Sequence, residues 1–137
     1  MKNNDLFVID TNILVSAFLF THSTPKLAYD KAKKAGRLVA SVETYNELCE
    51  VLVRPKFDKY ISLEIRLLII NEIKELLVFT SIGENITDCL DPKDNKFLEL
   101  AVAAEASCII SGDDDLLILN PFRGVPILNP IDFLDSF

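Results

Sequence analysis

Acidic and small polar side chains recur in four short segments of the 137-residue sequence. They are Asp10-Thr11-Asn12, Ser41 together with Glu47, residues 91–95 (DPKDN) and residues 111–115 (SGDDD). Ligand sets made only of oxygen atoms select hard cations such as Mg²⁺ or Mn²⁺. A cation of this kind can bind a phosphate oxygen, lower the pKa of a bound water and stabilise a leaving oxygen. A carboxylate cluster without a catalytic Ser, Cys or His therefore suggests hydrolysis of a phosphodiester by a metal-activated water.

Each segment also has an ordinary structural explanation when it is taken alone. Asp10 can cap a following helix, and Asp91 and Asp94 can be loop or cap residues, because Asp is a favoured N-cap. Residues 113–115 can form a solvated turn. Glu47 falls at the boundary between the apolar and polar faces of a predicted helix, where it can approach a cleft. The functional interpretation rests on the combination, because carboxylates gathered in one cleft resist ionising together unless a cation compensates them.

Histidine and cysteine are too few and too dispersed for two common kinds of site. His22 is the only histidine, and Cys49, Cys89 and Cys108 are widely separated with no C-x-x-C pair. These counts argue against a zinc finger and against a Ser-His-Asp triad. We expect reduced cysteines and a cytoplasmic protein. We also expect no membrane segment, since no uninterrupted apolar run approaches the roughly 20 residues that a membrane span needs.

The charge balance of the chain is strongly acidic. Asp and Glu number 21 against 14 Lys and Arg, which gives a formal net charge of −7 at pH 7. Phosphate contacts require Lys and Arg, so this balance argues against tight, nonspecific binding of nucleic acid. It does not argue against chemistry on a phosphodiester, because a bound divalent ion supplies positive charge that the side chains lack.

The order of the predicted elements indicates a single domain over residues 1–137, and the length is sufficient for a core of its own. Short apolar runs predict strands at residues 6–9, 37–40, 78–82, 108–111 and 127–128. Helical patterns separate them at residues 12–20, 25–35, 42–53, 63–77 and 94–105, and a helical turn follows the last strand. This alternation predicts an α/β fold, a three-layer α/β/α sandwich with a mainly parallel sheet. In such folds the ligand site lies beyond the carboxyl ends of the strands, where the acidic segments fall.

The longest predicted helix, residues 63–77, carries more apolar side chains than one buried stripe requires. Nine of its positions are Leu or Ile. We expect this helix either to be buried on two sides or to contact another subunit. The second alternative predicts a homo-oligomer.

Taken in order, the motifs resemble those of the PIN domain family (the PilT N-terminus-like nucleases), and especially its bacterial branch of toxin components of toxin–antitoxin pairs. The resemblance covers nearly the whole chain. It is carried by residues 8–14 (VIDTNIL), Ser41 with Glu47-Leu48, residues 91–101 (DPKDNKFLELA) and residues 111–117 (SGDDDLL). It implies a ribonuclease that prefers single-stranded RNA and depends on Mg²⁺ or Mn²⁺, with one or two ions bound.

The resemblance also implies roles for individual residues. The catalytic, metal-binding acids would be Asp10, Glu47, Asp94 and Asp113. The supporting residues would be Asn12 and Ser111 beside these acids, with Asp91 and Asp115 as auxiliary ligands. The implied partners are an RNA substrate and a small antitoxin protein. The main basic residues that could line a path for RNA are Lys31, Lys33, Lys34, Arg37, Arg54, Lys56 and Lys59.

Two of the acids have competing candidates. Many small PIN toxins place the third acid 18 residues before the fourth, which here is Asn95, whereas Asp94 lies 19 residues before Asp113. A shift of one residue at the entry to the helix would restore the geometry for Asp94. The roles of Asp113 and Asp115 could also be exchanged.

Two other functions compete with a nuclease. A haloacid-dehalogenase-like phosphatase also begins with an Asp after its first strand, but it needs a second Asp two residues later, where this chain has Asn12. The other is a catalytically weak or inactive PIN-like protein-interaction module. The intact set of acids disfavours it.

Overall fold

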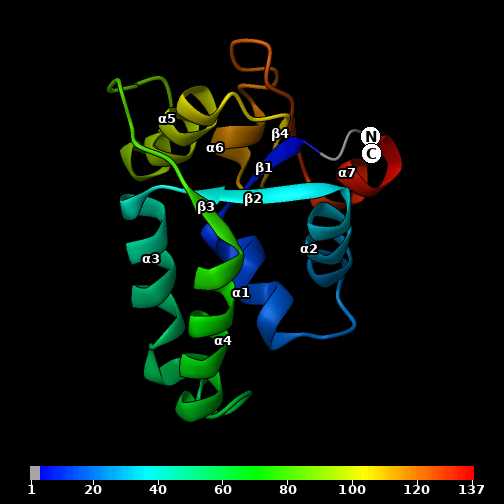
Figure 1. Cartoon of the computed structure of the whole chain (residues 1–137), viewed down its shortest axis with the longest axis vertical. Helices are drawn as coiled ribbons and strands as arrows, with labels where there is room; N and C mark the ends of the chain where they lie inside the picture. Colours follow the sequence, from blue (N-terminus) through cyan, green and yellow to red (C-terminus); the bar gives the residue numbers. More distant parts are fainter. Residues whose placement is uncertain (1–3) are drawn as a thin grey trace.

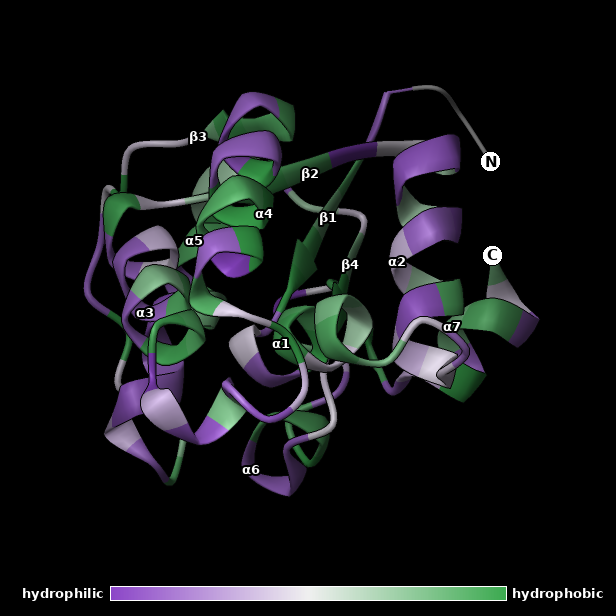
Figure 2. Cartoon of the chain, turned by 90° about the horizontal axis from the view of Figure 1, so that it is seen from below, coloured by the Kyte–Doolittle hydropathy of each residue, from purple (hydrophilic) through white to green (hydrophobic). Residues whose placement is uncertain are grey.

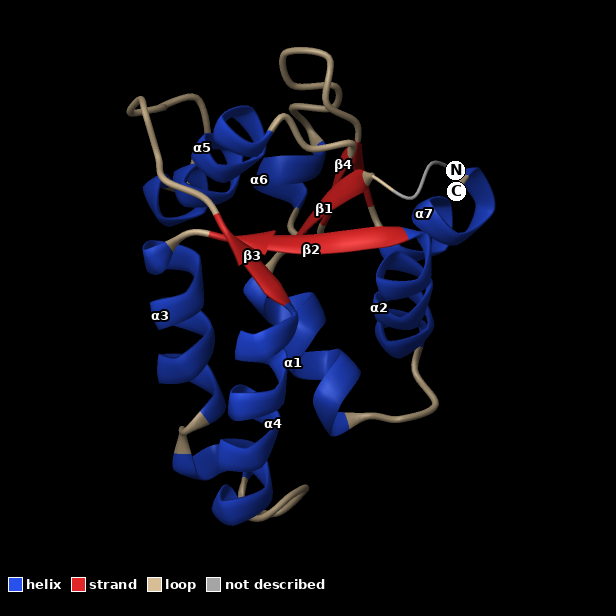
Figure 3. Cartoon of the chain, viewed as in Figure 1, coloured by secondary structure: helices blue, strands red, loops and turns tan. Residues whose placement is uncertain are grey.

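The protein folds around a five-stranded parallel sheet. In the computed structural model, which describes residues 4–137, the strands lie in the order β3-β2-β1-β4-β5. Their bounds are Asp5–Ile9 (β1), Gly36–Ala40 (β2), Leu77–Phe79 (β3), Cys108–Ile110 (β4) and Ile127–Leu128 (β5). All neighbouring strands are parallel, and they lie together at the centre of the molecule (Figure 3).

Helices cover both faces of the sheet and complete the predicted three-layer α/β/α architecture, which is confirmed. The first face carries α1 (Thr11–Leu19), α2 (Thr24–Ala35), α3 (Val42–Leu52), α4 (Leu63–Leu76) and α7 (Pro130–Ser136). The second face carries α5 (Asn95–Ala104) and the short α6 (Asp114–Leu117), as Figure 1 shows. Two 3-10 turns, η1 (Pro55–Phe57) and η2 (Pro92–Asp94), precede α4 and α5.

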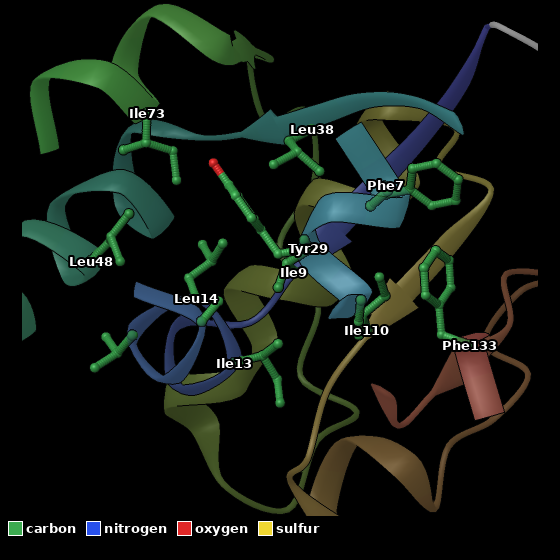
Figure 4. Packing of buried hydrophobic residues seen from close by; sticks show 14 of the residues in the cluster. Phe7, Ile9, Ile13, Leu14, Tyr29, Leu38, Leu48, Ile73, Ile110 and Phe133 are labelled. Carbon is green, nitrogen blue, oxygen red and sulfur yellow. The ribbon is translucent and has the colours of Figure 1, made fainter. Parts of the chain in front are cut away.

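Alternate residues of the central strand enter two different cores. Phe7 and Ile9 pack among the helices of the first face, together with Leu38 and Ile110 from the neighbouring strands (Figure 4). Val8 belongs to the core on the second face. This period of two, with apolar residues on both sides, is expected of a strand in a buried parallel sheet. In Figure 2, β1 is green over most of its length, whereas α2 alternates between purple and green, as a helix that covers one face does.

The central strand lies at a reversal of the strand order. β2 and β3 lie on one side of β1, and β4 and β5 lie on the other. The register pairs Ile9 with Ile110, so the residues that follow, Asp10 and Ser111, leave the sheet at the same level. A topological switch point of this kind is where open α/β sheets place their ligands.

The third strand and one helix differ from the prediction. β3 covers Leu77–Phe79 rather than residues 78–82, because it is an edge strand that pairs only with β2. Beyond Thr80, whose N–H still donates to Ala40 O at 2.8 Å, the chain leaves the sheet and forms the long tan loop before α5 in Figure 3. The one-turn helix α6 was not predicted, since four residues are too few to show a helical period.

The expectation that the longest helix is buried on two sides is wrong. Only Arg66 and Ile73 of α4 are buried. Its exposed apolar residues are Leu63, Ile65, Leu67, Leu68 and Leu76, with exposed fractions from 44% to 63%. The exposed apolar face is the feature that the alternative, contact with another subunit, requires. Although α4 is apolar, no helix within residues 4–137 is long and apolar enough to cross a membrane.

The buried guanidinium of Arg66 fixes the connection between α3 and α4. Its Nε donates to Ile61 O at 3.0 Å, and its Nη1 donates to Leu52 O and to Arg54 O at 3.1 Å. Its Nη2 forms an ion pair with Asp58. Three backbone carbonyls and a carboxylate satisfy the charged group, which is what its burial demands.

Candidate active site

Asp10 is the most deeply placed acid of the site. It follows β1 directly and begins α1 as its N-cap, where Oδ1 accepts a hydrogen bond from the Ile13 N–H at 2.9 Å. Its other oxygen, Oδ2, accepts from the hydroxyl of Ser111. Asp10 is only 4% exposed, and burial raises the pKa of its carboxyl, although the hydrogen bonds from Ser111 and Ile13 oppose this rise. One side chain therefore caps α1 and also contacts Ser111 at the end of the neighbouring strand.

Ser111 joins the ends of two neighbouring strands. It follows β4, is fully buried, and donates to Asp10 while its Oγ accepts from the Asp113 N–H at 3.0 Å. Asp113 in turn begins α6, with Oδ1 accepting from the Asp115 N–H at 2.8 Å. One hydroxyl thus sets the orientation of Asp10 and the backbone position of Asp113.

Asp94 is the acid with the most perturbed carboxyl. Burial, followed by the hydrogen bond and the negative charge of the adjacent Asp113, raises its pKa to about 7. The negative charges of Asp91 and Asp10 act in the same direction. Within residues 4–137, the buried Oδ2 of Asp94 has no hydrogen-bond partner. An anionic oxygen in this position is costly unless a positive group binds it.

The neighbour of Asp94 that competed for the third position points elsewhere. Asn95 is buried, and its Oδ1 accepts from the Cys89 N–H at 2.8 Å, which ties the preceding loop to the start of α5. Asp94 lines the pocket described below, and Asn95 does not. The geometry therefore places Asp94 among the other acids despite its longer spacing from Asp113.

Asp91 and Asp115 lie close to Asp94. Asp91, Asp94 and Asp115 each place one carboxylate oxygen within 4.8 Å of the others. Asp91 also caps η2, because its Oδ1 accepts from the Lys93 N–H at 3.0 Å. Asp113 lines the pocket while Asp115 does not, so the two acids occupy different places around Asp94.

Glu47 reaches the site from α3 on the first face of the sheet. Helix α3 begins with a capping box in which the Thr44 N–H donates to Ser41 Oγ at 3.1 Å and the Ser41 N–H donates to Thr44 Oγ1 at 2.9 Å. Ser41 therefore starts the helix and does not line the pocket. Glu47 accepts from the Thr11 hydroxyl through Oε1 and forms an ion pair with Lys96 through Oε2.

Lys96 is a functional candidate that residue types alone did not reveal. It lies two residues after Asp94 in the DPKDNK segment, on the first turn of α5, and its ammonium meets Glu47 from a distant part of the chain. The signal that could have found it is its place inside a motif that already carried two acids. A lysine at the start of a helix is otherwise typical of a solvated surface.

The acids surround an open pocket of about 360 Å³ at the carboxyl edge of the sheet. Its lining includes all four predicted catalytic acids together with Asn12 and Asp91. The remaining lining residues are Thr11, Glu50, Val51, Arg54, Lys93 and Phe97. Of these, Glu50 and Val51 lie outside the segments and basic residues that the sequence indicated for the site. The four sequence segments thus converge on one place, as the parallel-sheet topology requires.

The donor set of this pocket fits a divalent cation. Six Asp and Glu side chains line the pocket, and their carboxylate oxygens are the ligands that Mg²⁺ and Mn²⁺ prefer. The unpartnered Asp94 oxygen and the raised pKa values of Asp10 and Asp94 are what uncompensated carboxylates produce when they share a site.

The family of the chain follows from comparison with known proteins. The model of the PIN domain matches residues 7–115, which contain the last three residues of β1, all of β2 to β4 and every acid of the pocket. The chain belongs to the PIN domain family. PIN domains are generally nucleases, so membership places the protein in a class of hydrolases that act on nucleic acids.

A relative and three solved structures agree with this assignment. An uncharacterized protein of Methanocaldococcus jannaschii is 32% identical over 115 residues, which cover 82% of this chain and 73% of the relative. VapBC2 from Rickettsia felis, solved bound to a promoter DNA fragment, has a TM-score of 0.60 at 13% identity and covers 90% of this chain and 98% of its own.

The other two structures are similar over comparable lengths. VapBC-1 from nontypeable Haemophilus influenzae has a TM-score of 0.58 at 16% identity, covering 92% of this chain and 98% of its own. A Pyrobaculum aerophilum protein has a TM-score of 0.61 at 10% identity, covering 97% of this chain and 89% of its own. At these identities the likeness establishes the shared fold.

Proposed function

We propose that this protein is an endoribonuclease that depends on Mg²⁺ or Mn²⁺ and cleaves single-stranded RNA. The observation that carries the proposal is the convergence of Asp10, Glu47, Asp94 and Asp113 in one pocket, with a buried oxygen of Asp94 left unpartnered. Within residues 4–137, no histidine or cysteine lines the pocket, so this set of carboxylates is suited to hydrolysis by an activated water rather than to covalent catalysis.

Asp10, Asp94 and Asp113 would hold one or two cations, with Glu47 completing the set and Asp91 and Asp115 as auxiliary ligands. When bound, the cation lowers the pKa of a water and neutralises negative charge on the phosphoryl group. In the hydrolysis, a bond forms between the water oxygen and phosphorus, and the bond from phosphorus to the leaving ribose oxygen breaks.

The chain's own residues hold this reaction in place. Ser111 and the Ile13 N–H orient the two oxygens of Asp10, so the carboxylate needs little rearrangement when substrate arrives. Glu47, held by Thr11 and Lys96, is the acceptor that steers the attacking water. The amide of Asn12 lines the same pocket and can donate to a phosphoryl oxygen.

The biological role we propose is that of a cytoplasmic toxin held inactive by a small antitoxin protein. Two structures with the same fold are of VapBC proteins, and this likeness together with the toxin-like motifs supports the role. Co-expression with a small protein that binds the chain as its antitoxin should relieve growth inhibition caused by the wild-type chain. Inhibition that is equal with the Asp10→Asn variant would contradict a toxin that acts by cleavage.

We also propose that the chain forms a homo-oligomer through the exposed apolar face of α4, defined by Leu63, Ile65, Leu67, Leu68 and Leu76. Large apolar side chains exposed in this number on one helix are typical of an interface. A monomeric mass at micromolar concentration, measured by light scattering, would refute the oligomer without affecting the nuclease proposal.

The test of the nuclease is a cleavage assay on structured and unstructured RNA in EDTA, Mg²⁺ and Mn²⁺. We expect cleavage of the unstructured RNA only with a divalent ion, and a loss of about 1,000-fold in kcat/KM for Asp10→Asn, about 4 kcal/mol of transition-state stabilisation. Asp114→Asn is the matched control, because Asp114 is exposed and lies outside the pocket.

Two results would contradict the proposal. Wild-type rates in a folded Asp10→Asn protein would remove the acidic cluster from the mechanism. A purified wild-type protein, free of antitoxin, that binds Mn²⁺ but cleaves no RNA at high concentration would instead identify a PIN-like interaction module.

A further inference from the structure

Four cationic side chains of the chain have no partner within residues 4–137. They are Lys34, Arg37, Arg54 and Lys93. The other Lys and Arg side chains in this part of the chain form an ion pair, a hydrogen bond or a contact with an aromatic ring. Of the four, Arg54 and Lys93 line the acidic pocket. Lys34 and Arg37, which the sequence also suggested for an RNA path, line other hollows of the surface and not this pocket.

Arg54 lies just beyond α3, where the chain has already left the helix. It directly precedes η1, its backbone is extended, and its side chain is exposed. It lines the same pocket as Glu50, but no ion pair joins the two side chains within residues 4–137. The guanidinium is therefore available for an anion from outside the chain.

The backbones that carry the two free cations are firmly held. Arg54 O accepts from the buried Arg66 guanidinium at 3.1 Å, and the Arg54 N–H donates to Val51 O at 3.2 Å. The Lys93 N–H donates to the Asp91 carboxylate at 3.0 Å. Each cation thus extends from a fixed point, which lowers the entropic cost of placing it on a ligand.

The pocket poses an electrostatic problem for RNA that these two cations address. Six of its lining residues are carboxylates, and Arg54 and Lys93 are its only lining cations within residues 4–137. A cation held by the acids can neutralise the phosphate under attack, but the next phosphates along the strand carry one charge each. Arginine binds a phosphate through two parallel hydrogen bonds, and lysine binds it as a point charge.

We propose that Arg54 and Lys93 bind the phosphates on either side of the scissile phosphodiester, an inference that rests on the ribonuclease proposed above. Lys93 belongs to η2 and Arg54 directly precedes η1, so the two residues come from segments far apart in the sequence, and both line one pocket with the acids. The pair makes flanking phosphates a requirement for tight binding. It thereby selects internal linkages of a strand over a dinucleotide, which has a single phosphodiester.

The test compares Arg54→Gln and Lys93→Gln with the matched controls Arg37→Gln and Lys34→Gln, which remove equally free cations away from the pocket. Binding of a labelled single-stranded RNA is measured by fluorescence anisotropy in the Asp10→Asn background with Mn²⁺, where the RNA stays intact. We expect Arg54→Gln to weaken binding about tenfold and to reduce the salt slope by about 0.7, the value for one lost contact to a single strand. Lys93→Gln should weaken binding about fivefold, and both controls should stay within about twofold.

Kinetics with otherwise wild-type protein separate binding from chemistry. We expect Arg54→Gln to raise KM about tenfold with kcat changed less than about twofold, as removal of uniform binding predicts. The rise in KM should vanish on an RNA in which neutral methylphosphonates replace the two phosphodiesters that flank the cleavage site.

Equal binding and KM for the pocket variants and their controls, in a protein that cleaves RNA, would overturn the role of Arg54 and Lys93 alone. An Arg54→Gln effect that persists on the neutral-linkage RNA would also overturn it. A wild-type protein that cleaves no RNA with either ion would instead remove the ribonuclease on which the inference rests.

Discussion

The two sides of the pocket compensate their negative charge in different ways. On the sheet side, Asp10 is fixed by uncharged donors, Ser111 and the Ile13 N–H, and the oxygen of Asp94 has no partner within residues 4–137. On the helix side, Glu47 already has a cation, the ammonium of Lys96. Burial and neighbouring acids raise the pKa values of Asp10 and Asp94, which is the behaviour of carboxyls without a counter-charge.

The difference assigns different tasks to the two sides. Within residues 4–137, no cationic side chain pairs with the acids of the sheet side, and an external cation would supply the positive charge. The helix side is neutralised from within the chain, so Glu47 is better suited to position a water or to complete a ligand set than to hold a cation alone. Three ways to test this contrast follow, from the largest expected effect to the smallest.

Ser111→Ala should damage the sheet side most. It removes the donor to Asp10 and the acceptor of the Asp113 N–H, and both groups are then left without this partner. We expect kcat/KM to fall about 30-fold, within the range for groups that orient metal ligands, and the free energy of unfolding to fall by about 1–2 kcal/mol. RNA cleavage and urea unfolding measure the two effects.

Ser107→Ala is the control for this change, because Ser107 precedes β4 and donates to Asp5 at 3.0 Å, away from the pocket. Its cleavage rate should match the wild type. Equal losses of activity in both variants would mean that Ser111 acts only through the stability of the sheet.

Lys96→Met should act on the helix side with a mixed result. Without the ammonium, Glu47 loses its ion pair and its fixed orientation, so cleavage should fall about tenfold. Loss of a nearby positive charge should at the same time strengthen Mn²⁺ binding about threefold. Isothermal titration calorimetry measures Mn²⁺ binding, and a cleavage assay measures the loss of activity.

Lys96→Arg should retain most of the activity, since it keeps the charge, and Lys34→Met should change neither quantity. If Lys96→Met weakened Mn²⁺ binding, the ammonium would be supporting the cation site instead of competing with it.

The stability of the metal-free protein should depend on pH through Asp94. Its pKa is raised from 3.8 to about 7 in the folded state, so between these values the folded chain holds a proton that the unfolded chain releases. The contribution is complete below about 3.8 and is lost as the pH rises through about 7. We expect Tm in EDTA to fall between pH 5 and pH 8 by a few degrees at most.

Asp94→Asn should flatten this profile, and saturating Mn²⁺ should weaken it, because a bound cation favours the ionised carboxylate. A Tm in EDTA that rises steadily over the same pH range would show that another group controls the dependence.

The sequence was sufficient to predict which acids meet at one edge of the sheet, because local signals and topology agreed there. Asp10 and Ser111 each directly follow a short apolar strand, and a parallel sheet brings such positions to one edge. The long-range partners could not be predicted in the same way. The pairing of Lys96 with Glu47 joins residues 49 positions apart and depends on how α3 and α5 approach each other.

The fold was predictable to a similar extent, and the failures have physical causes. The order of strands and helices follows from their hydrophobic patterns, but the end of β3 depends on its having a single neighbouring strand. On α4, the apolar residues outnumber the buried positions, and Arg66 takes a buried place that its type does not suggest. Tertiary packing decides which apolar residues of α4 stay exposed, and the periodicity of the sequence does not predict that packing.

The central claim is that the pocket is a metal centre. Its most direct test is isothermal titration calorimetry of the purified, antitoxin-free chain with Mn²⁺. The uncompensated carboxylates of the sheet side predict saturable binding of one or two ions per chain, about 10-fold or more weaker in Asp94→Asn and unchanged in Asp114→Asn. Absence of saturable binding to the folded wild-type protein at millimolar Mn²⁺, or equal binding to all three proteins, would contradict a metal centre at this pocket.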